Sequence, residues 1–144
     1  SENVEDIADA RVDESDFAAD VHGSVVKLDE EINHLINILG EPDSFTETVS
    51  NPRIGSEKIY IYDGIVIYTS PENGKDIVNS IAYCGEEKTL SGIGIGSTRA
   101  DIEAAYGIHY IIDPNYIIYQ YGEDATLRFY MKGEECECIE LNWE

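Results

Sequence analysis

Apolar residues recur at helical spacing near the start of the chain and then give way to strict alternation with polar residues. Gly40 can take the left-handed conformation that ends a helix, and Pro42 prevents the helix from resuming. We therefore expect an amphipathic helix over residues 28–39 with one buried face. The apolar positions on that face are Val25, Leu28, Ile32, Leu35, Ile36 and Leu39.

Period-two alternation after this helix predicts four strands, over residues 45–49, 58–63, 65–69 and 77–84. Asp63 and Gly64 form a dipeptide typical of a tight hairpin turn, and the segment 71–74 forms a looser one. The first half of the chain is thus expected to be one helix followed by an antiparallel meander.

The same order recurs further along the chain. Thr98 with Asp101 is typical of a helix N-cap pair, and Gly107 ends this second helix. The Tyr-x-Tyr motif and a later isoleucine are 21 residues apart in the first half and 20 in the second. We interpret this as a duplicated unit. The second set of predicted strands covers residues 109–112, 116–121, 125–131 and 136–143.

The predicted fold class is α+β, with two tandem helix-plus-four-strand antiparallel units that form one continuous sheet. A single unit cannot cover both sides of its sheet, so the two units are expected to join into one larger sheet with both helices packed on one face. We divide the chain into an acidic lead-in (1–23), a first unit (24–87) and a second unit (88–144), which together make one globular domain.

The formal net charge is −21, from 30 acidic and 9 basic residues. Such a charge disfavours binding to nucleic acid or to an anionic lipid surface. No apolar run reaches the roughly 18 residues of a membrane span, and the first residues do not resemble a signal peptide. Residues 1–20 hold eight acids and one base. They are interpreted either as the spacer behind a removed export signal, with or without a lipid anchor, or as an arbitrary chain end.

The sequence does not decide whether its three cysteines form a disulfide or remain reduced. Cys136 and Cys138 share one face of a predicted strand, where a bond between them would be strained. Either Cys84 pairs with one of these two, or all three are buried thiols. A zinc site is disfavoured because the chain lacks C-x-x-C spacing.

The sequence shows no pattern of residues typical of catalysis. The glycine-rich segment 92–96 is neither a dinucleotide-binding motif nor a P-loop, so we interpret it as a flexible approach to the second helix. His22, His34 and His109 lack the spacing of metal ligands, and the chain has neither a nucleophile elbow nor an EF-hand. We therefore predict no catalytic residue, no metal and no cofactor.

Tyrosine dominates the aromatic residues, with ten Tyr against three Phe and one Trp. Tyrosine combines a large rigid contact area with a polar tip and is enriched in binding surfaces. It is also a good strand former that is often half-buried on a sheet. With helices on one side only, some of these rings are expected to face outward. The predicted binding residues are Tyr60, Tyr62, Tyr68, Tyr119, Tyr121 and Tyr130.

Two short motifs resemble the repeat of the beta-lactamase inhibitory protein family, to which a small lipoprotein of the outer-membrane barrel-assembly machinery is related. They are Leu-Gly-Glu-Pro at 39–42, and Ile-Gly-Ser-Thr at 95–98 leading to Tyr-Gly at 106–107. The likeness covers about residues 24–143. The motif's start is clear only in the second unit and Leu-Gly-x-Pro only in the first. The resemblance implies a non-catalytic, exported or lipid-anchored protein that binds other proteins across its sheet.

We therefore expect a non-catalytic exported or cell-surface module that contacts a protein or a cell-envelope component through a tyrosine-rich sheet face. The alternative is a small carboxylate-dependent hydrolase of the cell envelope, with its carboxylates in a cleft between the units. A third hypothesis is a structural spacer, which predicts no exposed aromatic patch. A deep pocket holding titratable groups with shifted pKa values would favour the enzyme, and a broad shallow face would favour the module.

Overall fold

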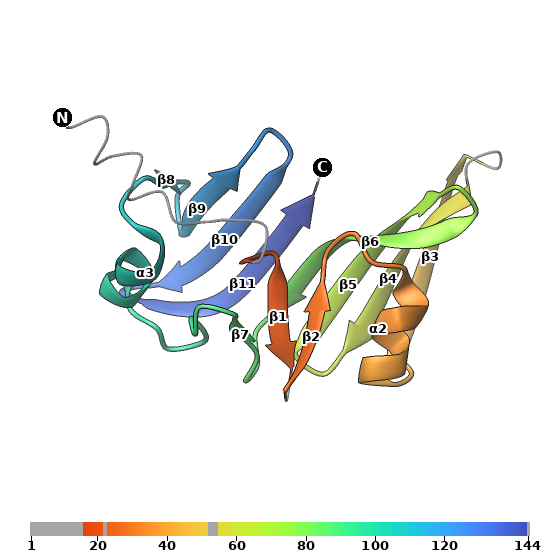
Figure 1. Cartoon of the computed structure of the whole chain (residues 1–144), viewed down its shortest axis with the longest axis horizontal. Coiled ribbons are helices and arrows are strands. Elements are labelled where there is room, and N and C mark those ends of the chain that lie inside the picture. Colours follow the sequence, from red (N-terminus) through yellow and green to blue (C-terminus); the bar gives the residue numbers. More distant parts are fainter. Residues whose placement is uncertain (1–15, 22, 52–54, 144) are drawn as a thin grey trace.

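A computed structural model describes residues 16–21, 23–51 and 55–143 (Figure 1). These residues form two β-sheets and two short helices. In chain order the elements are β1 (Ala18–Val21), β2 (Ser24–Lys27), α2 (Ile32–Leu39), β3 (Ser44–Asn51), β4 (Gly55–Tyr62), β5 (Ile65–Glu72), β6 (Lys75–Tyr83), β7 (Lys88–Thr89), α3 (Arg99–Tyr106), β8 (Ile111–Ile112), β9 (Tyr116–Tyr121), β10 (Ala125–Lys132) and β11 (Glu135–Trp143).

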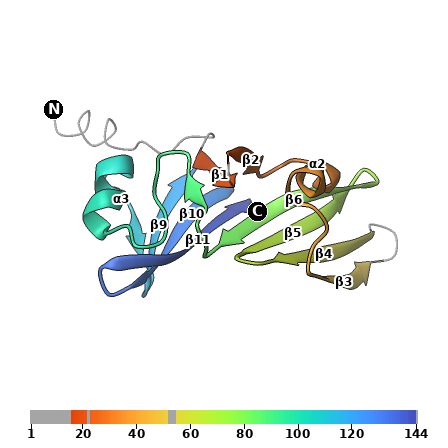
Figure 2. The same ribbon diagram turned by 90° about the horizontal axis from the view of Figure 1, so that it is seen from below.

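The main sheet has eight antiparallel strands in the order β3-β4-β5-β6-β11-β10-β9-β8. Its halves meet at β6 and β11, where Ile139 lies opposite Tyr83 and Leu141 opposite Ile81. A small sheet has the order β2-β1-β7. Figure 2 shows that this small sheet and both helices lie over the same face of the main sheet. The protein is therefore two-layered, and no described element covers the other face of the main sheet.

The predicted α+β class, with two helix-plus-four-strand units and only helices as the cover, is wrong. The described chain is mostly strand, each helix has only eight residues, and a second sheet is present. A helix of eight residues is about 12 Å long, whereas eight strands span roughly 38 Å. Two such helices leave the middle of the main sheet bare. The small sheet, which lies between them, covers that middle (Figure 2).

The first helix begins later than the apolar spacing predicts. Val25 belongs to β2, and the chain then turns before α2 begins at Ile32. The cause is Asp29, whose φ of 66° is incompatible with a right-handed helix. Its N–H donates to the carbonyl of Val78, whose own N–H donates to the carbonyl of Glu30. Hydrogen bonds to β6 therefore replace the first turn of the expected helix.

Most predicted strands are confirmed with small changes at their ends, and β9 matches its predicted bounds. The predicted strand 109–112 shortens to β8. The N-cap pair is also confirmed, because Thr98 and Asp101 form a reciprocal capping box at the start of α3. The hydrogen bonds from Thr98 lower the pKa of the Asp101 carboxyl.

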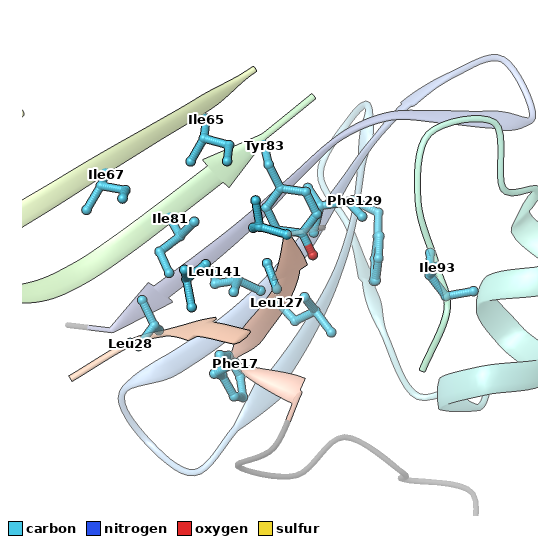
Figure 3. Packing of buried hydrophobic residues seen from close by; sticks show 14 of the residues in the cluster. Phe17, Leu28, Ile65, Ile67, Ile81, Tyr83, Ile93, Leu127, Phe129 and Leu141 are labelled. Carbon is cyan, nitrogen blue, oxygen red and sulfur yellow. The ribbon is translucent and has the colours of Figure 1, made fainter. Parts of the chain in front are cut away.

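The core lies between the two layers, and side chains from both reach it (Figure 3). Phe17 and Leu28 contribute from the cover, and Leu127, Phe129 and Leu141 contribute from the main sheet. Most of the acidic lead-in, residues 1–15, lies outside the described residues. The division of the chain at residues 23 and 87 stays a prediction.

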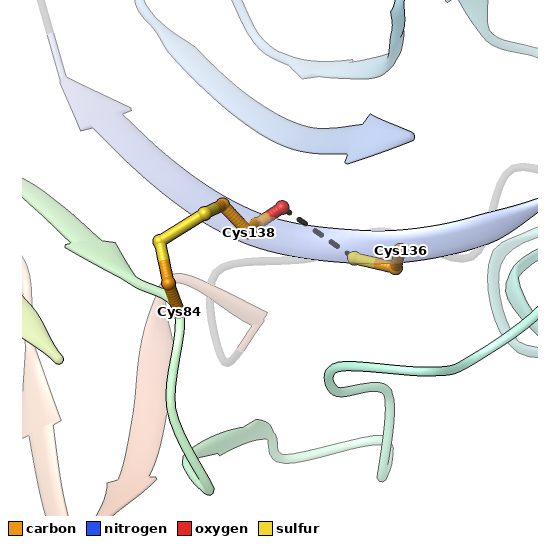
Figure 4. Close-up of a disulfide and its surroundings, with 3 residues drawn as sticks. All are labelled: Cys84, Cys136 and Cys138. Carbon is orange, nitrogen blue, oxygen red and sulfur yellow. Dashed lines mark hydrogen bonds between the residues drawn. A yellow bond between two sulfur atoms is a disulfide. The ribbon is translucent and has the colours of Figure 1, made fainter. Parts of the chain in front are cut away.

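A disulfide joins Cys84 to Cys138 across the centre of the main sheet, with 4.3 Å between their Cα atoms (Figure 4). The register explains this choice, because Ile139 opposite Tyr83 places Cys138 beside Cys84. Cys136 is free and buried, and its thiol donates to the carbonyl of Cys138. Burial raises the pKa of the Cys136 thiol to about 11, which keeps it protonated and unreactive at neutral pH.

Two buried tyrosines allow a matched test of the core. The hydroxyl of Tyr83 has no hydrogen-bond partner among the described residues, whereas that of Tyr106 lies 2.8 Å from the Thr89 hydroxyl. Removing an unsatisfied buried hydroxyl is favourable, so Tyr83→Phe is expected to raise the free energy of unfolding by up to about 2 kcal/mol. Tyr106→Phe is expected to lower it by about 1 kcal/mol. Urea unfolding of both variants measures the difference, and a larger loss for Tyr83→Phe would contradict this account.

Candidate functional site

The uncovered side of the main sheet, called the open face below, is the candidate site. Strand alternation identifies its side chains. Ile139 and Leu141 are buried beneath the cover, so Glu140 between them points to the open face, and so does Asn142. Because Glu140 lies opposite Ala82 and Asn142 opposite Ser80, the open face continues without a break from β11 to β6. It therefore crosses the line where the two halves of the sheet meet.

A hollow of about 460 Å³ lies on the open face beside this line, over β3, β4, β5, β6 and β11; we call it the central hollow. Its lining is mostly polar, with two carboxylates, one lysine and the aromatic rings of Tyr68 and Trp143. The lining residues used below include Glu57, Tyr68, Asn79, Ser80, Glu140 and Asn142.

Hydrogen bonds hold the polar floor of the central hollow in place. The Ser80 hydroxyl donates to the Asn142 carboxamide oxygen at 2.6 Å, which ties β6 to β11. The Asn79 amide donates to the Ser70 hydroxyl. The β5–β6 register shifts beside Tyr68, and Asn79 is the extra residue of this bulge. Bulges redirect side chains and are common next to binding sites, so the bulge explains why a hollow forms at this point of the sheet.

Three tyrosines lie on the open face. The Tyr68 side chain is 41% exposed and lines the central hollow. Tyr116 and Tyr130 are opposite each other on β9 and β10, with their ring centroids 5.3 Å apart. A hydrogen bond to Glu140 raises the pKa of the Tyr116 hydroxyl. Glu140 therefore links this tyrosine pair to the central hollow.

Of the six tyrosines predicted to bind, Tyr68 and Tyr130 lie on the open face, and the other four point to the covered side. Tyr60 and Tyr119 are only 6% and 2% exposed and form part of the core. The hydroxyls of Tyr62 and Tyr119 donate to the carbonyls of Gly40 and Gly107, which end the two helices, each at 2.7 Å. The Tyr121 ring packs against Phe17 of the cover at 5.9 Å. The structure therefore does not bring the six rings together on one surface.

Sequence reasoning missed Tyr116 and the polar residues of the central hollow. Tyr116 begins the predicted strand 116–121, but the face on which it lies depends on its pairing with Tyr130. The polar residues come from five strands, and Asn79 reaches the hollow through a bulge that no local pattern marks. The usable signal was that Asn142 lies between Leu141 and Trp143, and that Asn79 and Ser80 interrupt an otherwise apolar predicted strand.

Burial raises the pKa values of the core tyrosines Tyr83, Tyr106 and Tyr119, which keeps their hydroxyls protonated and neutral.

The described residues contain no group of three or more His, Cys, Asp and Glu side chains placed to hold a metal ion. His34 lies 3.1 Å from the Glu30 carboxylate at the surface, and His22 lies outside the described residues. Within the described part of the chain, no helix has the length and apolarity needed to span a membrane.

Comparisons with known proteins add a likeness of fold. No protein-family model and no curated protein matches the chain. An extracellular protein containing a SCP domain, from Bacillus anthracis, has a similar structure with a TM-score of 0.57 and 13% identity. The match covers 81% of this chain and 44% of that one, so this chain spans less than half of that protein's length.

A DUF4309 family protein from Bacillus subtilis matches with a TM-score of 0.44 and 16% identity, over 80% of this chain and 79% of that one. This second match is too distant to carry an argument. Neither protein is described as a beta-lactamase inhibitory protein or as an outer-membrane assembly lipoprotein. The resemblance inferred from the short motifs is therefore not supported by these comparisons.

Proposed function

We propose that this chain is a non-catalytic binding module that acts outside the cell, either secreted or held at the cell surface, and that its open face contacts a protein of the cell envelope. The observation that carries the proposal is an eight-stranded sheet with one face left uncovered by every described element, on which Tyr68, Tyr116 and Tyr130 flank a polar hollow. Tyrosine beside a polar, hydrogen-bonding surface is typical of protein contact sites.

The size and shape of the open face support a protein as the ligand. Eight strands span roughly 38 Å, which is wide enough for the ~800 Å² that each partner contributes to a standard interface. The central hollow gives this broad surface one place where a side chain of the partner can insert. Tyr68 lines the central hollow and is partly exposed. Partly exposed aromatic residues next to pockets are common interface hot spots.

Charge indicates the kind of partner. With a formal net charge of −21, the chain repels other acidic proteins and attracts those with a basic surface. Glu57 and Glu140 bring negative charge to the central hollow, and its one lysine, Lys58, is paired with the Asp76 carboxylate. A basic patch on the partner is therefore expected to face the hollow, and its association rate is expected to fall as salt is added.

Two observations support an extracellular location. The Cys84–Cys138 disulfide is typical of proteins in oxidising compartments, and a protein of similar fold is described as extracellular. The proposal includes a lipid anchor ahead of Ser1 as one way in which the chain is held at the cell surface.

Affinity capture from an envelope extract of the producing organism tests the proposal. We expect the tagged chain to retain one dominant protein, and the Tyr68→Ala/Tyr130→Ala double variant to retain at least about tenfold less of it. Tyr121→Ala is the matched control, because Tyr121 is exposed to a similar extent as Tyr68 but lies on the covered side. Equal retention by all three proteins, or capture of polysaccharide alone, would contradict the proposal.

The alternative is a small carboxylate-dependent hydrolase, favoured by the presence of both Glu57 and Glu140 in the central hollow. It predicts turnover of an envelope polymer by the purified chain and loss of that turnover in Glu140→Gln. The binding module predicts no turnover by either protein.

A further inference from the structure

The first strand of the main sheet, β3, has a free edge. It lies at the edge of the sheet and pairs only with β4 (Figure 1). It runs for eight residues and exposes every side chain from Ser44 to Thr48. The strand at the opposite edge, β8, has only two residues. The edge of β3 is thus the long free edge of the main sheet in the described chain.

Proteins usually protect such an edge with lysine, proline, a bulge or a covering element, because its unpaired N–H and C=O groups can add another strand. Between Ser44 and Asn51 the chain has no lysine and no proline, and its one charged residue is Glu47. A register shift in the β3–β4 pairing occurs only near the far end, between Val49 and Asn51. The segment 44–49 is therefore a regular strand without the usual protection.

Two side chains of β3 define what could lie beside it. Phe45 and Glu47 are two residues apart and share the covered side of the sheet. Phe45 is 48% exposed and its ring packs 5.2 Å from that of Tyr60, which leaves an apolar ledge at the edge. Glu47 is held by the Ser56 hydroxyl, which donates to its carboxylate. Lys58 of β4 lies opposite Glu47 but is paired with Asp76. The edge thus offers one apolar and one acidic contact on the same side.

A second copy of this chain is a poor occupant. Two β3 strands paired antiparallel about their centres would bring the two Glu47 carboxylates close together, and like charges on facing strands are destabilising. Each copy also carries a net charge of −21. Charge complementarity instead favours a segment with a basic residue.

We propose that β3 accepts an extended segment of a partner protein as a ninth, antiparallel strand, with Lys or Arg beside Glu47 and an apolar residue beside Phe45. Backbone hydrogen bonds supply the attraction, and these two side-chain contacts set the preference, as in other cases of strand addition. The two side-chain contacts lie on the covered side and the backbone contacts at the edge, whereas the function proposed above uses the open face, to which β3 contributes Thr48. The peptide test therefore does not depend on that function.

Hydrogen–deuterium exchange with a defined peptide tests the proposal. The probe is acetyl-Thr-Thr-Lys-Thr-Val-Thr-Thr-amide, in which Lys and Val have the spacing needed to face Glu47 and Phe45 in antiparallel pairing. We expect it to slow exchange of amides in residues 44–49. Replacing its Lys by Glu is expected to weaken binding at least about threefold. N-methylation of alternate backbone amides of the peptide is expected to abolish binding, because it removes the N–H groups that donate hydrogen bonds to β3.

Charge variants of the protein complete the test. Glu47→Lys is expected to reverse the preference, so that the Glu peptide binds better than the Lys peptide. Glu123→Lys changes the net charge equally in the turn between β9 and β10, and it is expected to keep the original preference. The Tyr68→Ala variant is expected to bind the Lys peptide with the same affinity as the unaltered protein.

Three results would overturn the proposal. The first is protection of another strand, or of none at the highest soluble peptide concentration. The second is equal binding of the N-methylated peptide. The third is protection of residues 44–49 in the concentrated protein without peptide, together with a dimer in sedimentation, which would make a second copy the occupant.

Discussion

Replacing Cys84 and Cys138 together by serine is expected to lower the free energy of unfolding by about 4 kcal/mol. The disulfide joins residues 54 positions apart, and closing a loop of that length restricts the unfolded chain strongly. It also joins the residue after β6 to β11, and these two strands are where the halves of the main sheet meet. Such a loss is a large share of the 5–15 kcal/mol typical of a domain.

Guanidinium unfolding of the oxidised protein and of the double variant measures this loss. Reduction of the unaltered protein with dithiothreitol should give the same shift. Cys136→Ala is the matched control, because Cys136 is on the same strand but has no disulfide, and it is expected to cost only about 1 kcal/mol. The expectation fails if the double variant is no less stable than Cys136→Ala.

Leu35→Ala in α2 is expected to lower the free energy of unfolding by about 2–5 kcal/mol. Leu35 is fully buried in the core beneath the short helix, so truncation leaves a cavity that the surrounding sheet cannot close. Thermal unfolding followed by circular dichroism measures the effect as a lower melting temperature.

Asn37→Ala is the matched control for this helix. Asn37 lies two residues further along α2 and is exposed, so its truncation is expected to change stability by no more than about 0.5 kcal/mol. Equal effects of the two substitutions would show that α2 does not pack its Leu35 face on the core.

Features set by neighbouring residues could be predicted from the sequence. Alternation located most strands of the main sheet, because a strand with one buried face must place apolar residues at every second position. The pair Thr98 and Asp101 predicted the start of α3, since a capping box is formed within one turn. Leu35 was correctly placed in the core for the same local reason, the spacing of its helical face.

Features set by distant partners could not be predicted. The small sheet pairs Ala19 with Thr89, and β1 alone carries no pattern that names so remote a partner. The late start of α2 has the same origin, because Asp29 is held out of a helix by a hydrogen bond to Val78. The predicted fold class was wrong because these long-range pairings decide what covers the main sheet.

The register of strand pairing also explains why the observed site differs from the predicted one. The sequence left open whether Cys84 pairs with Cys136, with Cys138 or with neither. It also predicted that Tyr60 and Tyr62 share a face of the sheet, but not which face. The β6–β11 register selects Cys138. The cover over one side of the main sheet buries Tyr60 and leaves Tyr68 outside. Period two alone divides a strand into two equivalent faces, and only tertiary packing makes one of them the core and the other the open face.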